Sequence, residues 1–184
     1  VEFIRGSAAD PKKKFKETST LHPSSPYSST KAAGDLLCMS YFRTYGLPVI
    51  VTRGSNTYGP YQYPEKLIPF FVLRMLQNKK MPLYGDGKNT RDWLFVEDHC
   101  RAIEVALTKG KLGEIYNISA DEYHTNLDIA RRIGGPIEFV PDRPGHDRKY
   151  VPDSGKIRRE LGWKPKAKFD SALKETITWF QKNL

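Results

Sequence analysis

A tyrosine and a lysine stand four residues apart at the start of the first helical pattern in the chain. Tyr27 and Lys31 lie in the run Ser-Pro-Tyr-Ser-Ser-Thr-Lys, residues 25–31. Residues four apart share one face of a helix, so the lysine ammonium can lie beside the phenol. A neighbouring cation favours the phenolate form, which makes tyrosine a usable acid/base at neutral pH. The pair predicts a proton-transfer site; the plain alternative is a packing tyrosine and a surface lysine.

Other residues further along the chain suit an anionic ligand. Asn56 and Thr57 directly follow a strand pattern, and open α/β sheets bind ligands at that end of their strands; turn capping is the alternative. Arg91 precedes a strand, and its planar guanidinium suits a phosphate, although a surface ion pair would also explain it. Lys66 begins a helical pattern, where the helix dipole disfavours a cation unless an anion is bound.

Two acidic segments each allow a functional and a structural interpretation. The run Asp-Arg-Pro-Gly-His, residues 142–146, combines a stiff turn with hydrogen-bond donors and an acceptor; it is a candidate ligand loop or a charged surface loop. Glu97, Asp98 and His99 include metal-ligand types, but three consecutive side chains point in different directions, and helix capping is the preferred interpretation. We therefore expect no metal site.

Alternating helix and strand patterns must position these residues. The apolar spacing predicts helices, and compact β-branched or apolar runs predict strands. Helices are expected at 27–44, 65–79, 97–108, 127–133, 154–161 and 171–183. Strands are expected at 48–53, 81–84, 92–96, 114–119 and 137–140. The strand at 48–53 should be buried on both faces of a parallel sheet, and the order of the elements indicates an α/β fold.

Composition excludes several classes of protein. The 184 residues carry 30 Lys and Arg against 21 Asp and Glu, a net charge of +9, with 39% hydrophobic residues. Such a chain can bury a core, and no stretch is long and apolar enough to span a membrane. The dispersed positive charge comes without a nucleic-acid-binding motif, so anionic small ligands are favoured over nucleic acid. Two isolated cysteines, Cys38 and Cys100, are expected to be reduced packing residues of a cytoplasmic protein.

Several ordered motifs resemble a known family. Tyr27-x-x-x-Lys31 is similar to the motif of the short-chain dehydrogenase/reductase superfamily, and residues 54–60, Gly-Ser-Asn-Thr-Tyr-Gly-Pro, resemble its extended nucleotide-sugar branch. Within that branch, the NAD-dependent epimerase/dehydratase family, the chain is most similar to the dTDP-glucose 4,6-dehydratases. The motifs that carry this similarity are residues 63–69, 82–85, 91–93, 96–99 and 142–147.

The resemblance implies a hydro-lyase with NAD as cofactor. In that family NAD holds a hydride from the sugar C4 while a tyrosine takes the 4-hydroxyl proton. A glutamate and an aspartate then eliminate water, and the hydride returns to C6. The reaction converts dTDP-glucose into dTDP-4-dehydro-6-deoxyglucose, for the biosynthesis of deoxysugars such as rhamnose.

The same resemblance assigns roles to residues of this chain. Tyr27 would be the catalytic acid/base, and Lys31 would hold the nicotinamide ribose and tune the tyrosine. Thr57 would be near the cofactor, at a position where the family often has asparagine. The residues implied in substrate binding are Asn56, Lys66, Leu67, Pro82, Tyr84, Arg91, Asn126, Asp142, Arg143, Pro144, Gly145 and His146.

Two family motifs are absent from the sequence. None of the 14 glycines forms Gly-x-x-Gly-x-x-Gly, and no Thr-Asp-Glu precedes Tyr27. We therefore expect the chain to represent only part of a longer enzyme, and a chain of this length alone to fail to hold NAD. The expected fold is the C-terminal part of a Rossmann-type doubly wound sheet plus a smaller α/β nucleotide-sugar-binding domain. Residues 1–60 would be a remnant of the NAD-binding domain, and residues 61–184 mainly the substrate domain, with some elements returning to the Rossmann sheet.

Two alternatives remain open at this point. Another nucleotide-sugar enzyme of the superfamily, such as an epimerase, a decarboxylase or a UDP-sugar dehydratase, would share Tyr27 and Lys31. A non-catalytic nucleotide-sugar-binding fragment would lack turnover altogether. Leu37, Met39, Tyr41 and Phe42 cover more of the helix at 27–44 than one core face needs, which predicts a homodimer through this helix.

Overall fold

The computed structural model describes residues 14–183, apart from residues 24, 144 and 147. Within these residues, helices alternate with short strands, which confirms the expected α/β class. The helices are α1 (Pro26–Tyr45), α2 (Leu67–Leu76), α3 (Val96–Lys109), α4 (Asn126–Ile133), α5 (Gly155–Leu161) and α6 (Phe169–Asn183). The strands are β1 (Val51–Gly54), β2 (Asn56–Tyr58), β3 (Met81–Tyr84), β4 (Thr90–Phe95), β5 (Ile115–Ile118), β6 (Tyr123–Thr125), β7 (Ile137–Val140) and β8 (Lys149–Tyr150).

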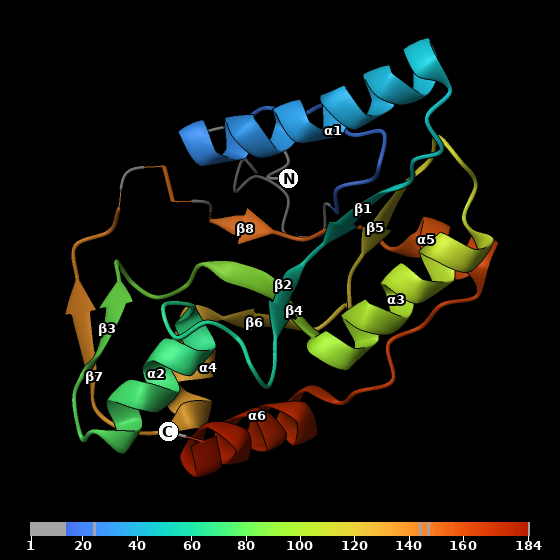
Figure 1. The fold of residues 1–184 in the computed structure, drawn as a ribbon. Helices are drawn as coiled ribbons and strands as arrows, with labels where there is room; N and C mark the ends of the chain where they lie inside the picture. The colour runs from blue at the N-terminus through green and yellow to red at the C-terminus, as the bar shows by residue number, and fades with distance from the viewer. Residues whose placement is uncertain (1–13, 24, 144, 147, 184) are drawn as a thin grey trace.

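The strands pair mostly in parallel, between segments far apart in the sequence. β1 pairs with β5 and β3 pairs with β7, both in parallel. β4 is the central strand of the third group, where it pairs in parallel with β2 and β8 and antiparallel with β6. Figure 1 shows α1 above β1 and β8, with α6 at the opposite end of the molecule.

All the longer predicted elements are present, with ends shifted by a few residues. The strand expected at 48–53 begins only at Val51 and is not uniformly buried, because Val51 and Arg53 are buried while Thr52 and Gly54 are half-buried. The prediction missed β2, β6 and β8, which are two or three residues long. A strand that short shows no alternation in its own sequence, and its pairing with β4 defines it.

Helix α1 is defined by its caps more than by its packing. Ser25 forms a capping box with Ser28, Pro26 occupies the first turn, and Gly46 ends the helix in the left-handed conformation at φ 66°. These are favoured residues at those positions, because each satisfies or avoids an unpaired backbone group. Only Ser28 and Ala32 are buried among the residues of α1.

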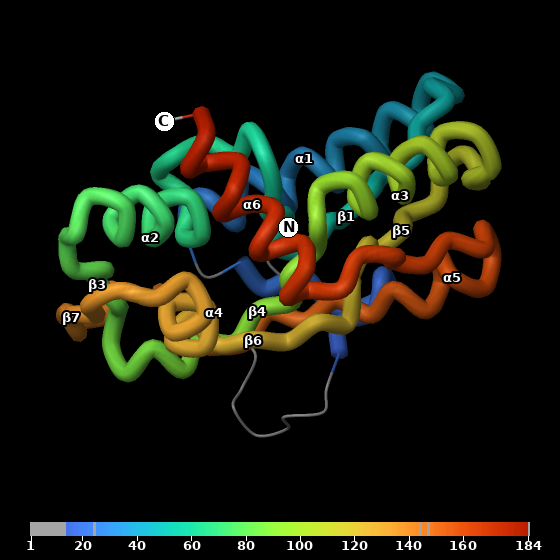
Figure 2. Tube along the Cα trace, turned by 90° about the horizontal axis from the view of Figure 1, so that it is seen from below, coloured from blue at the N-terminus to red at the C-terminus, as the bar shows by residue number. Residues whose placement is uncertain are grey.

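The apolar core falls into two clusters. The larger cluster joins α2, α4 and α6 to β2, β3 and β4, and the second joins α3 and α5 to β4 and β5. Figure 2 shows α2 and α4 on one side of the molecule and α3 and α5 on the other. Fully buried members of the larger cluster include Tyr58, Ile68, Val72, Met81, Leu83, Ile129 and Phe180.

Two sequence expectations concern the surface. Cys38 and Cys100 are both free, but both are exposed, so their prediction as packing residues is wrong. Among the residues that the structure describes, no helix has the length and apolar character needed to cross a lipid bilayer.

Candidate functional site

The first candidate group lies at the start of α1. The Lys31 Nζ atom lies 5.8 Å from the centre of the Tyr27 ring, so the two side chains share a face as their spacing predicts. Tyr27 is 64% exposed, which leaves its phenol accessible to a ligand. The Glu65 carboxylate, 2.8 Å from Lys66 Nζ, raises the pKa of Lys66, and the Tyr27 phenol acts in the same direction with a smaller effect. Lys66 therefore belongs to the surroundings of Tyr27.

A buried ion pair attaches α1 to the β1–β5 pair. Arg53 in β1 is 4% exposed, and its Nε donates to Asp35 Oδ2 of α1 at 2.6 Å. Its Nη1 donates to the carbonyl of Glu17 at 3.3 Å, and the Glu17 carboxylate accepts from the Asn117 backbone N–H at 2.9 Å. This connection was not predicted; the available signal was an arginine at the end of a mostly apolar, β-branched strand pattern.

Asn56 and Thr57 lie just beyond the C-terminal end of β1, as predicted, but in a short strand of their own and not in a turn. They are the first two residues of β2, and Asn56 stands opposite Trp93 of β4. Thr57 Oγ1 is 2.8 Å from His99 Nδ1 and 3.3 Å from the carbonyl of Ser55. Burial lowers the pKa of His99, so the neutral ring is favoured in this contact.

The acidic start of α3 has a different role from the one predicted. Phe95 is the N-cap of α3 and makes no side-chain cap hydrogen bond, so the capping interpretation of residues 97–99 is wrong. The buried Asp98 instead accepts from the backbone N–H groups of Lys166 and Ala167, at 2.8 and 2.9 Å. Asp98 thus fixes the segment that leads into α6.

The second candidate group surrounds His146. Its Nδ1 lies 2.7 Å from Asp142 Oδ1, and its ring meets the Tyr84 ring edge-on at 6.2 Å between centroids. Burial lowers the pKa of His146, the Asp142 carboxylate opposes that shift, and the charges of Arg143 and Arg91 add to it. The structure therefore brings together five residues of the predicted ligand set, from β3, β4 and the loop after β7.

The remaining predicted binding residues are distributed as follows. Asn126, the first residue of α4, is buried, and its backbone N–H donates to the carbonyl of Asn89 at 3.1 Å. Leu67 and Pro82 are half-buried at the start of α2 and within β3. Gly145 is exposed with φ 71°, and Pro144 lies outside the described residues.

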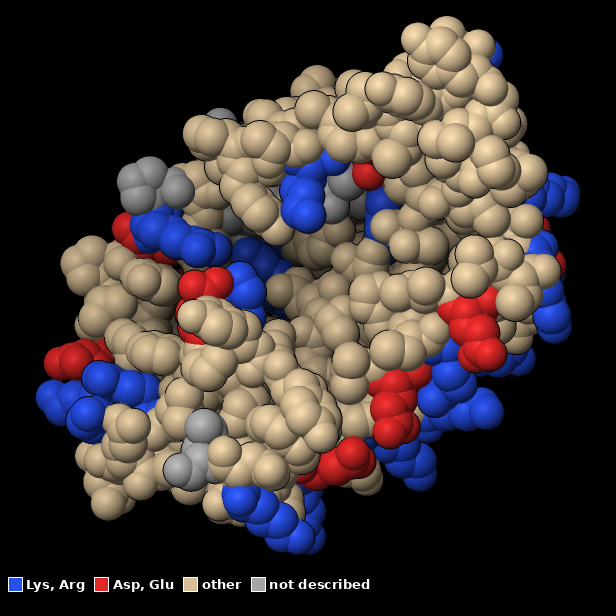
Figure 3. Space-filling model, in the orientation of Figure 1, with Lys and Arg blue, Asp and Glu red and all other residues tan. Residues whose placement is uncertain are grey.

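The surface of the molecule has a hollow that is edged by basic side chains. Figure 3 shows it below α1, with Lys and Arg side chains gathered along its edge on the side of β3. A concave surface with several cations favours an anionic ligand. Such a surface suits a phosphate-bearing molecule, and the Tyr27–Lys31 pair and the cationic and aromatic side chains around His146 are the candidate residues that would contact it.

Comparison with known proteins identifies the family. The model of the GDP-mannose 4,6-dehydratase family matches residues 6–176. The chain belongs to this family. Among curated members, the dTDP-glucose 4,6-dehydratase of Salmonella typhimurium is 49% identical over 183 residues, covering 92% of this chain and 51% of that protein. The dTDP-glucose 4,6-dehydratase of Neisseria meningitidis is 46% identical over 187 residues, covering 92% of this chain and 53% of that protein.

Solved structures of family members have the same fold. The dTDP-glucose 4,6-dehydratase from Bacillus anthracis, in complex with NAD, superposes with a TM-score of 0.91 at 48% identity, covering 99% of this chain and 58% of that chain. The UDP-glucuronic acid 4-epimerase from Bacillus cereus superposes with a TM-score of 0.90 at 27% identity, covering 94% of this chain and 57% of that chain. The chain spans about half the length of the curated relatives it matches.

These comparisons bear out the resemblance stated from the motifs. The curated relatives at 45–49% identity are named dTDP-glucose 4,6-dehydratases. The α/β fold with its parallel strand pairs corresponds to the C-terminal part of the dehydratase structures, which confirms the predicted fold class.

Proposed function

We propose that the chain is a part of a dTDP-glucose 4,6-dehydratase that carries its nucleotide-sugar site and its catalytic tyrosine. The whole protein would be a hydro-lyase that converts dTDP-glucose into dTDP-4-dehydro-6-deoxyglucose, with NAD as transient hydride acceptor, in deoxysugar biosynthesis. The observation that carries the proposal is the contact between Lys31 and Tyr27, with Nζ 5.8 Å from the ring centre, on an exposed face of α1. The identity of 49% to a curated dehydratase supports it.

Tyr27 has the role of the acid/base in this proposal. Its exposed phenol can take a proton from a sugar hydroxyl, and the ammonium of Lys31 stabilises the resulting phenolate. Lys66, within electrostatic reach of Tyr27, adds a second positive charge. When bound, NAD supplies the hydride acceptor, and Lys31 and Thr57 would contact it on the nicotinamide side.

The remaining residues would hold the nucleotide diphosphate and the sugar. Arg91, Arg143 and Lys66 supply cations for the two phosphates. Tyr84, Leu67 and Pro82 supply apolar surface for the base, since nucleotide bases stack on such side chains. Asn56, Asn126, Asp142, Pro144, Gly145 and His146 would complete the binding site.

The residues present fit only part of an NAD site. Tyr27 and Lys31 suit the ribose end, but no glycine-rich fingerprint for the pyrophosphate occurs among the 14 glycines. We therefore propose that residues 1–60 belong to an NAD-binding domain and residues 61–184 mainly to the substrate domain. The return of β5 to pair with β1 supports an exchange of elements between the two.

Two measurements test this proposal. The chain alone should bind dTDP saturably in a calorimetric titration and should not retain NAD. In a protein that joins this chain to an NAD-binding half, dTDP-glucose should give a 4-keto product, detected by its absorbance in alkali. Tyr27→Phe should lower kcat by a factor of about 10² to 10⁴, as loss of a general acid/base does, and leave the dTDP Kd unchanged. Release of a C4 epimer, or full activity of Tyr27→Phe, would contradict the assignment.

We further propose that α1 packs against a second copy to form a homodimer. Leu36, Leu37, Tyr41 and Tyr45 of α1 are 46–74% exposed, and contiguous apolar surface of this kind marks interaction sites. Light scattering should give twice the chain mass, and a monomer at all concentrations would exclude the dimer.

The free state of Cys38 and Cys100 supports a cytoplasmic location.

A further inference from the structure

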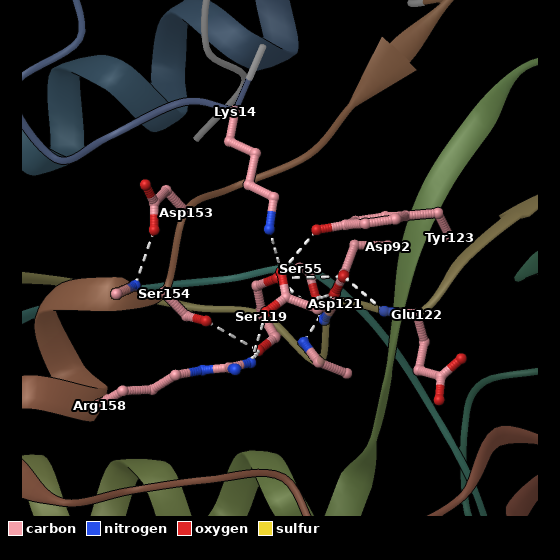
Figure 4. A network of polar contacts seen from close by, with 12 residues as sticks. Lys14, Ser55, Asp92, Ser119, Asp121, Glu122, Tyr123, Asp153, Ser154 and Arg158 are labelled. Carbon is pink, nitrogen blue, oxygen red and sulfur yellow. Dashed lines mark hydrogen bonds and ion pairs between the residues drawn. The ribbon is translucent and has the colours of Figure 1, made fainter. Parts of the chain in front are cut away.

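Asp92 is a fully buried carboxylate at the centre of a polar network (Figure 4). Its Oδ1 accepts from the Ser55 hydroxyl at 2.6 Å and from the Ala120 backbone N–H at 2.9 Å. Its Oδ2 accepts from the Ser119 hydroxyl at 3.0 Å and from the Glu122 backbone N–H at 3.1 Å. A buried carboxylate is retained at low cost only when its oxygens are satisfied in this way.

Asp92 and its partner Ser55 are each adjacent in sequence to a proposed substrate residue. Ser55 directly precedes Asn56, which starts β2, and Asp92 directly follows Arg91 in β4. β2 and β4 pair with Asn56 opposite Trp93. The Asp92 carboxylate directly follows Arg91 and accepts from Ser55, which directly precedes Asn56. This side-chain hydrogen bond therefore connects the two strands in addition to their backbone pairing.

The same carboxylate holds the turn between β5 and β6. Asp121 in this turn has φ 64°, an unfavourable value for a residue with a side chain. Arg158 and Lys14 form ion pairs with Asp121 on the outer side of the turn, at 2.7 and 2.8 Å, as Figure 4 shows. Asp92 holds the flanking Ala120 and Glu122 amides from the inner side. The turn is fixed from both sides, so the position of Asp92 is fixed as well.

We propose that Asp92 is a positioning residue that sets the separation between Asn56 and Arg91 in the nucleotide-sugar site. The proposal rests on the proposed function, since Asn56 and Arg91 are its assumed contacts with the sugar and the phosphate. Asp92 acts through these neighbours and does not itself touch the ligand.

Asparagine cannot reproduce the pattern of acceptors at this position. Each oxygen of Asp92 accepts one backbone N–H, from Ala120 and from Glu122. Either orientation of an asparagine amide would place its NH2 group against one of these donors, and backbone donors cannot rotate away as hydroxyls can. Asp92→Asn should therefore shift the junction between β2, β4 and the turn while it keeps the side-chain volume.

Charge and geometry predict opposite effects of this substitution on ligand affinity. Removing a negative charge near a diphosphate site favours the anion by Coulomb attraction to the remaining cations. If Asp92 acted only through its charge, Asp92→Asn would tighten the binding of dTDP. Weaker binding can arise only from displaced contacts, so the sign of the change separates the two effects.

Asp98 provides a matched control in the same chain. It is also a buried aspartate, and each of its oxygens accepts a backbone N–H, from Lys166 and Ala167; it also forms an ion pair with Arg101. Asp98→Asn creates the same clash between donors, but at the segment that leads into α6. Because Asp98→Asn also weakens the ion pair with Arg101, it should lose at least as much stability as Asp92→Asn and still leave the ligand site unchanged.

The experiment compares dTDP titrations of the wild-type chain, Asp92→Asn and Asp98→Asn, with thermal unfolding of each. We expect the dTDP Kd to rise about tenfold for Asp92→Asn, the scale of a lost buried hydrogen bond, and to stay within about twofold for Asp98→Asn. An unchanged or lower Kd for Asp92→Asn, or an equal rise for both variants, would overturn the positioning role. If the wild-type chain itself fails to bind dTDP, the proposed function fails first.

A milder pair of variants decides the question if Asp92→Asn does not fold. Ser55→Ala removes one hydroxyl donor to Asp92, and Thr176→Val removes a buried hydroxyl in α6 whose only role shown is a bond to the Ala172 carbonyl at 2.7 Å. Ser55→Ala should raise the dTDP Kd about threefold, and Thr176→Val should not change it. Equal affinities of the two variants would contradict the proposal.

Discussion

The helix that carries Tyr27 and Lys31 is held by different contacts from the elements that carry Tyr84 and Arg91. In α1 only Ser28 and Ala32 are buried, and the buried Arg53–Asp35 ion pair connects the helix to β1. In contrast, β3 and β4 are part of a large apolar core with α2, α4 and α6. The proposed acid/base pair is therefore oriented by a few polar contacts, while the cationic and aromatic group is built on a packed scaffold.

This difference separates two kinds of sensitivity. Apolar packing is spread over many side chains, so a change there lowers the stability of the fold as a whole. A single ion pair has a fixed direction, so a change there alters where one helix lies and has a smaller effect on global stability. Substitutions that displace α1 should mainly lower kcat. Substitutions in the core under β3 and β4 should mainly lower the stability of the fold and the affinity for the nucleotide.

The largest expected difference is between two leucines. Leu173 in α6 is 3% exposed, and Leu36 in α1 is 66% exposed. Leu173→Ala should lower the free energy of unfolding by about 2–5 kcal/mol through the lost packing and the cavity, and Leu36→Ala by less than about 0.5 kcal/mol. Urea unfolding at concentrations where the chain is monomeric measures both. Equal losses would show that α1 is as well packed as the core.

A smaller effect is expected for the ion pair under α1. Asp35→Asn leaves the buried Arg53 guanidinium without its carboxylate and should cost about 2 kcal/mol of stability. In the complete enzyme it should lower kcat and leave the dTDP Kd unchanged, because α1 moves and the core does not. Glu138→Gln breaks the Lys80–Glu138 pair, whose side chains are 62% and 48% exposed, and serves as the control with less than about 0.5 kcal/mol. A change in Kd without a change in kcat would contradict the comparison.

The smallest effect concerns the titration of His146. Burial keeps its pKa below the ordinary value of 6.5, and the Asp142 carboxylate partly opposes that shift. Asp142→Asn removes the stabilising anion, so the midpoint of His146 followed by NMR should fall further. The midpoint of His99, which burial alone lowers, should stay constant. A rise of the His146 midpoint in Asp142→Asn would show that the two side chains are apart in solution.

Particular residues show how far the sequence predicted the site. The spacing of Tyr27 and Lys31 sufficed to place their side chains together, since helical geometry alone determines that contact. The gathering of Arg91 near His146 was predicted only through the family resemblance. The long-range contacts of Asp92 and Asp98 and the Arg53–Asp35 pair were missed, because they join residues 18 to 69 positions apart in the sequence.

The sequence by itself determined the helices, the longer strands, the contact between Tyr27 and Lys31, and the family, because these depend on local periodicity and on ordered short motifs. Only the tertiary structure decided the three short strands that pair with β4 and the partners of the buried aspartates. The physical reason is that a buried carboxylate or backbone group needs a hydrogen-bond partner, and the chain's long-range packing selects which partner is in reach.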